Sequence, residues 1–135
     1  MSFKSNAVTV LTLVGLGVGA ATPVWANSTA IDVTYQTKGG AGMVSGKANS
    51  VYHTLSGGVK PVLRVTAHSG GLPGSSNADL YLDQFGADKF FGDVVPTVGT
   101  HYFQKTDKSS TKYYLEFYGG KAETTQEITG SLKDK

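Results

Sequence analysis

Hydrophobic and polar residues alternate over several short stretches of this chain, and this two-residue period is typical of half-buried β-strands. The clearest stretch is 31–37, where Ile31, Val33 and Tyr35 share one face and polar residues occupy the other. Further strands are predicted where similar runs lie between turn residues. These predicted strands cover residues 50–55, 62–68, 78–85, 101–106 and 111–118.

The strand predicted at 62–68 is expected to point Leu63, Val65 and Ala67 into the core and His68 toward solvent. This assignment follows from strict alternation, since successive side chains of a strand point to opposite faces.

The segments between these strands carry turn and loop signals. Residues 69–77 are rich in Gly, Pro, Ser and Asn, which interrupt regular structure, so this is the clearest predicted loop. Residues 90–95 place apolar pairs close to glycine, aspartate and proline, which suits a short edge strand or a loop. The polar tail 121–135 leaves three conformations open: a last strand, a short helix or a frayed end.

Residues 101–106 and 111–118 are predicted to form a β-hairpin, because the polar turn 107–110 separates them. Six or more short strands without a convincing amphipathic helix predict an all-β fold. We expect a single-domain antiparallel β-sandwich, with a small β-barrel as the alternative. The order of the strands stays open.

The first 26 residues predict export. Lys4 gives a positively charged start, residues 7–21 are apolar apart from Thr9 and Thr12, and the segment ends at Ala26 in small residues that suit signal peptidase. A retained membrane anchor is the alternative, but the run is shorter than the ~20 apolar residues of a spanning helix. We expect cleavage near Ala26, a signal peptide at 1–26, a β-sandwich domain at 27–135, and a secreted or wall-associated product without membrane insertion.

Composition narrows the class of protein further. Removing 26 of the 135 residues leaves 109, which is enough for one domain with its own core. The chain has no cysteine, and an exported domain without disulfides is commonest among bacterial proteins. Removing Lys4 from the 12 basic residues leaves 11 against 10 acidic ones, and the basic residues are scattered. We therefore expect no nucleic acid partner.

The predicted hairpin would gather tyrosines on its solvent side. The pairing that avoids two opposed lysines puts Phe103 opposite Tyr113, with both in the core beside Leu115 and Phe117. A tyrosine flanked by amides and charges can stack on a sugar ring or bind a protein. The candidate binding residues on that side are Tyr102, Gln104, Lys112, Tyr114, Glu116 and Tyr118.

These residues lead to a functional hypothesis with alternatives. The hypothesis is a small secreted, non-catalytic protein that binds an extracellular or cell-envelope glycan, the cell wall or a protein partner. One alternative is that the tyrosines only cover the sheet through cross-strand packing or lie beneath the tail. Another is a secreted antagonist, either an antibacterial protein or an enzyme inhibitor, that acts through an exposed loop such as 69–77.

Signals for catalysis and for metal binding are weak. The chain lacks cysteine and a Gly-x-Ser-x-Gly motif, so no catalytic residue is predicted, although His68 with Asp79 or Asp83 would be a conceivable hydrolytic pair. The three histidines are far apart in sequence, which does not suit zinc. We expect no cofactor, with calcium as the open alternative. The oxygen ligands for calcium would be Asn77, Asp79 and Asp83, or Asp88 and Asp93.

Overall fold

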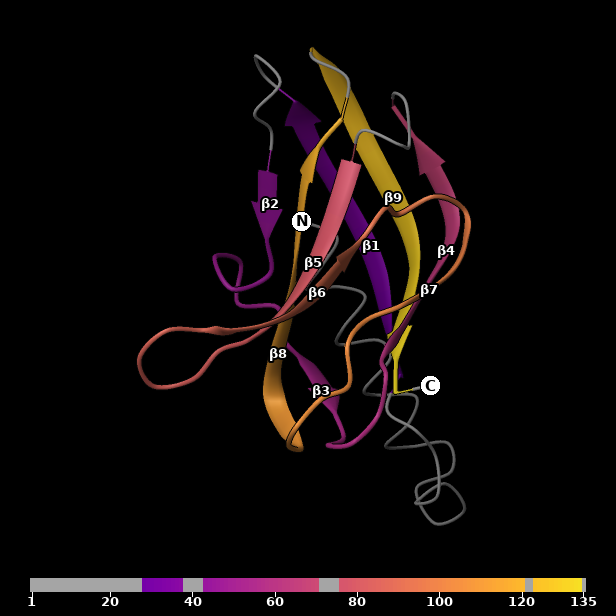
Figure 1. Cartoon of the computed structure of the whole chain (residues 1–135). Helices are drawn as coiled ribbons and strands as arrows, with labels where there is room; N and C mark the ends of the chain where they lie inside the picture. The colour runs from indigo at the N-terminus through magenta and orange to yellow at the C-terminus, as the bar shows by residue number, and fades with distance from the viewer. Residues whose placement is uncertain (1–27, 38–42, 71–75, 121–122, 135) are drawn as a thin grey trace, which may run out of the picture.

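The computed structural model of the protein describes residues 28–37, 43–70, 76–120 and 123–134. All regular structure in these ranges is β-strand, arranged in two antiparallel sheets that pack on one another (Figure 1). The predicted all-β fold with two packed sheets is thus confirmed. The predicted signal peptide lies outside the described residues. No helix in the described ranges has the length and apolar character needed to cross a membrane.

Sheet A has four strands, and the carboxy-terminal tail forms one of its two central strands. In spatial order they are β1 (Ser28–Thr37), β9 (Thr124–Lys133), β4 (Val62–Ser69) and β7 (Gly99–Tyr102). Strand β9 pairs along its whole length with β1 and on its other side with β4. Of the three conformations considered for the tail, the strand is therefore the correct one.

Sheet B has five strands. In spatial order four of them are β2 (Met43–Ser45), β8 (Ser110–Gly119), β5 (Ser76–Leu82) and β6 (Lys89–Val94), and β3 (His53–Leu55) also pairs with β8. The predicted strand at 50–55 is thus reduced to three residues. The edge strand predicted within 90–95 is confirmed as β6.

The hydrophobic core lies between the two sheets and follows the predicted alternation. Ile31, Val33 and Tyr35 are buried on the inner face of β1. The inward-facing residues predicted after position 100 are also buried, namely Phe103, Tyr113, Leu115 and Phe117. Burying each large apolar side chain stabilises the fold by roughly 1.5–3 kcal/mol, so these residues favour packing the inner faces of the two sheets against each other.

One predicted core residue is on the wrong face. Ala67 is exposed because the pairing of β4 with β9 shifts between Val65 and Ala67, which leaves one extra residue in β4. A bulge of one residue inverts the alternation beyond it. His68 consequently lies opposite the buried Ile128 and is half-buried rather than fully turned to solvent.

The predicted hairpin of 101–106 with 111–118 is wrong. Strand β7 pairs with β4 in sheet A, whereas β8 runs through sheet B between β2 and β5. Strands β7 and β8 lie in different sheets (Figure 1), so Tyr102 and Tyr114 do not face each other.

The chain crosses between the two sheets immediately after β7. The backbone NH of Phe103 donates to the carbonyl of Pro61, 2.9 Å away, beside sheet A, and the next NH, that of Gln104, donates to the carbonyl of Phe91 in β6, 2.8 Å away. A polar turn such as 107–110 is compatible both with a hairpin and with a connection between sheets. The local pattern therefore could not show which strand each segment would pair with.

Candidate functional site

The outer face of sheet B, which points away from sheet A, carries tyrosines and carboxylates in cross-strand rows. In one row Tyr114 lies opposite Tyr81, and in the adjacent row Glu116 lies opposite Asp79. Asp79 is in turn opposite Asp93 of β6. We call this surface the tyrosine–carboxylate face, and its residues are Tyr52, Asp79, Tyr81, Asp83, Asp88, Asp93, Tyr114, Glu116 and Tyr118.

Two tyrosines of this face hold the loop that joins β5 to β6. The Tyr52 hydroxyl donates to Asp83 Oδ2 at 2.7 Å, and the Tyr114 hydroxyl donates to Asp88 Oδ2 at 2.6 Å. Lys47 Nζ lies 2.8 Å from Asp88 Oδ2 and 3.4 Å from Asp83 Oδ1. The hydrogen bond from Lys47, followed by that from Tyr114, lowers the pKa of Asp88. These contacts attach the base of the loop to the sheet.

Tyr114 is therefore not an exposed binding residue. Its side chain is only 4% exposed, and its ring stacks on Tyr81 with centroids 5.4 Å apart and 16° between the planes. Tyr52 packs edge-on against the Tyr114 ring. Burial, together with the hydrogen bond to Asp88, raises the pKa of Tyr114. The alternative that this tyrosine covers the sheet through cross-strand packing thus describes its position. Its hydroxyl binds Asp88 of the loop between β5 and β6.

The row of carboxylates is held at an electrostatic cost. Burial, with a further contribution from the charge of Asp93, raises the pKa of Asp79, and burial with the charge of Asp79 raises that of Glu116. The hydroxyls of Tyr118 and Tyr81 donate to Asp79 at 3.3 and 3.4 Å and partly compensate for its burial. Burial also raises the pKa of Tyr81 to about 12. The carboxylates of this face therefore lie opposite one another although such pairing of like charges destabilises a sheet.

The predicted site residues Tyr102 and Gln104 lie elsewhere, in a groove at the edge where the two sheets meet. This hollow has a volume of about 420 Å³. We call it the edge groove, and it is lined by Lys60, Gly92, Asp93, Tyr102, Phe103, Gln104 and Lys105. Tyr102 is 63% exposed, the largest exposure of any tyrosine in the described ranges.

Local backbone geometry places the groove residues. Gly92 has a φ of +100°, and a Cβ there would lie 3.2 Å from Gln104 Cγ, so the glycine lets the Gln104 side chain lie close over β6. In the described part of the chain the ion pairs are formed by Lys47 and Lys89, so neither Lys60 nor Lys105 is in one of them. Both ammonium groups are thus available to a ligand.

The six predicted site residues are therefore divided between two surfaces. Lys112 lies on the tyrosine–carboxylate side, with its Nζ 4.5 Å from the centre of the Tyr52 ring, and Glu116 and Tyr118 are half-buried there. Asp93 joins the two surfaces, since it ends the carboxylate row and lines the groove. Sequence reasoning missed the two groove lysines, because only the crossing between sheets brings Lys60 and Lys105 together.

The conceivable hydrolytic pair is not formed. Both ring nitrogens of His68 are engaged in sheet A, with Nδ1 2.7 Å from the Pro96 carbonyl oxygen and Nε2 3.0 Å from Gln126 Oε1. The carboxylates of Asp79 and Asp83 bind tyrosines on sheet B instead. No group of three or more histidine, aspartate or glutamate side chains in the described ranges could hold a metal ion. The expectation of no cofactor stays a prediction, with calcium as its open alternative.

Part of the loop proposed for the antagonist alternative, residues 71–75, lies outside the described residues. No protein-family model matches the sequence, and no curated protein shows significant similarity to it. The candidate surfaces are therefore interpreted from their own geometry.

Proposed function

We propose that this chain is an exported, non-catalytic binding protein that recognises an extracellular or cell-envelope glycan in the edge groove. The observation that carries the proposal is the exposed ring of Tyr102 beside the Gln104 amide and beside two lysines that form no ion pair with any residue in the described ranges. A tyrosine ring can stack on the face of a sugar, and ammonium, amide and carboxylate groups can bind its hydroxyls. The export segment 1–26 supports an extracellular ligand.

The size of the groove favours a glycan over a protein as its ligand. A volume of about 420 Å³ falls in the range of small-ligand sites, roughly 300–1,000 Å³. A stable protein interface buries about 800 Å² on each partner, which seven lining residues do not supply. The groove is also supported from both sheets through the backbone bonds of Phe103 and Gln104. A rigid groove loses little conformational entropy when it binds.

Titration of the secreted protein with purified wall polysaccharide and with soluble oligosaccharides tests this function. Tyr102→Ala is expected to weaken binding about tenfold or more, and Tyr102→Phe, which keeps the ring, to stay within about threefold. Val98→Ala, at a residue that is 64% exposed outside the groove, is the matched control and should bind like the unmodified protein. Binding of no glycan by the unmodified protein, or equal binding by Tyr102→Ala, would refute the proposal.

A further inference from the structure

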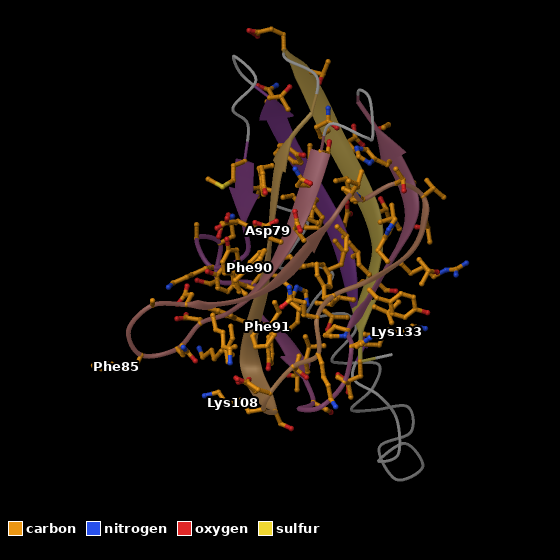
Figure 2. The ribbon with its side chains drawn as sticks, viewed as in Figure 1. Asp79, Phe85, Phe90, Phe91, Lys108 and Lys133 are labelled. Carbon is orange, nitrogen blue, oxygen red and sulfur yellow. The ribbon has the colours of Figure 1, made fainter. Side chains whose placement is uncertain are left out.

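The loop between β5 and β6, residues 83–88, carries a fully exposed phenyl ring. The side chain of Phe85 is 106% exposed, compared with 64% for Val98, the next most exposed large apolar residue among those described. The loop projects away from both sheets (Figure 1), and Figure 2 shows Phe85 at its far end. A solvated phenyl ring at the end of a projecting loop contributes nothing to the core.

The base of this loop is held by residues from two other segments. Tyr114 of β8 binds Asp88, and Tyr52, from the connection between β2 and β3, binds Asp83. Lys47, from the same connection, contacts both carboxylates. The Asp83 NH also donates to the Lys112 carbonyl at 3.0 Å. Phe85 is therefore presented from a fixed base.

The tip of the loop has its own support. The side-chain Nε2 of Gln84 donates to the Ala87 carbonyl at 3.1 Å and closes the turn across Phe85. Gly86 adopts a φ of +84°, which glycine accepts without strain. A loop that is ordered before it binds loses less conformational entropy on association.

We propose that Phe85 is the anchor of a protein-binding loop whose partner is a protein with an apolar pocket surrounded by basic side chains. The basic rim follows from charge. Asp83 and Asp88 flank the ring, and Lys47 and Lys112 balance their two charges at the base of the loop. The carboxylate row of Asp79 and Glu116 adds negative charge on the same sheet face. Opposite potentials across an interface favour association.

A protein pocket suits this loop better than a lipid membrane. Burying one phenylalanine contributes roughly 1.5–3 kcal/mol, which is marginal for membrane attachment because stable anchoring takes two signals. The second signal is usually a cluster of basic residues, whereas carboxylates flank Phe85. In a protein interface, one aromatic side chain in a central pocket can contribute about 2 kcal/mol or more. This proposal rests on a different surface from the glycan groove and is independent of it.

The experiment compares the mature protein with its Phe85→Ala variant and with Met43→Ala, a matched change at another exposed apolar residue of sheet B, 59% exposed. Extracellular and envelope proteins retained by the unmodified protein and by Met43→Ala, but not by Phe85→Ala, are identified and purified, and their dissociation constants are measured. Phe85→Ala should weaken binding by about tenfold or more, and Phe85→Leu by less than about threefold. Raising NaCl from about 0.1 to about 0.5 M should weaken it further.

Two further measurements test whether Phe85 instead binds a lipid membrane or a second copy of this chain. Vesicles of phosphatidylcholine, alone or with about a quarter phosphatidylglycerol, should not bind, and sedimentation should show a monomer. Binding to vesicles that requires Phe85, self-association that requires Phe85, or the absence of any purified protein whose affinity depends on Phe85 would each overturn the proposal. Tyr102→Ala should retain the protein partner, so a failure of the glycan proposal would be recognised separately.

Discussion

Glu116 lies directly opposite Asp79 on neighbouring strands of sheet B, so two carboxylates oppose each other on the outer face of the sheet. Asp93 extends the row on the far side of Asp79. Like charges placed directly opposite each other destabilise a sheet. The protein therefore maintains a negative face at some cost in stability, and the consequence for its pH dependence has a definite sign.

Replacing Glu116 by Gln should stabilise the protein at neutral pH by about 0.5 kcal/mol. The pKa of Glu116 and of Asp79 is raised in the folded state, so the folded protein holds more protons than the unfolded chain above the ordinary carboxyl pKa. This contribution to stability is present at low pH and is lost as the pH rises through the raised values. Urea unfolding at several pH values measures it.

The matched control is Glu127→Gln, at an exposed glutamate of sheet A for which no opposed carboxylate is paired in the sheet register. That variant should leave the pH dependence of unfolding unchanged. A similar loss of pH dependence in both variants would contradict the assigned role of the carboxylate row.

His53 should destabilise the fold as the pH falls, whereas protonation of Glu116 and Asp79 stabilises it. Its ring is buried, both nitrogens are without a hydrogen-bond partner in the described part of the structure, and burial lowers its pKa to about 4. Between about pH 6.5 and pH 4 the unfolded chain binds a proton that the folded protein does not, so stability falls by about 3 kcal/mol as the pH decreases across this range.

The variant His53→Leu should lose this decrease, because leucine binds no proton. Its free energy of unfolding at pH 7 and at pH 4 should differ by about 3 kcal/mol less than that of the unmodified protein. His101→Leu, at a partly exposed histidine outside the core, is the comparison. If His53→Leu retained the full decrease, another group would have to be responsible for the acid sensitivity.

Tyr114 should contribute to stability rather than to ligand binding. Tyr114→Phe removes only the hydroxyl that binds the charged Asp88 and should cost about 1.5–3 kcal/mol, the range for hydrogen bonds to charged groups. Tyr114→Ala also removes the buried ring and should cost about 3–5 kcal/mol. Thermal or urea unfolding measures both. The exposed Tyr102 is the control, and Tyr102→Ala should cost less than about 0.5 kcal/mol.

Gly130 should not tolerate a side chain. It lies where β9 passes the bulge of β4, and a Cβ there would overlap the Arg64 carbonyl oxygen. Gly130→Ala should therefore destabilise the protein by about 2 kcal/mol or more, since backbone would have to move. Ser131→Ala, at the adjacent half-buried position, is the control and should change the unfolding midpoint little. Equal midpoints for the two variants would show that the strands can separate there without cost.

The structure places only some of the predicted site residues at an accessible surface. Tyr102 and Gln104 do lie at an accessible groove, because alternation turns these two side chains away from the core, into which Phe103 between them points. The same alternation placed Tyr114 on the outer face of its sheet, which is correct, but Tyr81 and Tyr52 pack against its ring and its side chain is buried. Phe85 was predicted to be the last residue of the strand at 78–85 and was not named as a binding residue, whereas β5 ends at Leu82 and leaves Phe85 in the following loop.

The sequence by itself determined which side chains of each regular strand face the core. Ile31, Val33, Leu115 and Phe117 could be assigned because alternation is a property of consecutive residues. The tertiary structure decided which strands pair, where β4 bulges so that Ala67 turns outward, and which tyrosine is covered. These outcomes depend on backbone hydrogen bonds and packing between residues distant in sequence, and the alternation within one strand carries no information about its neighbour.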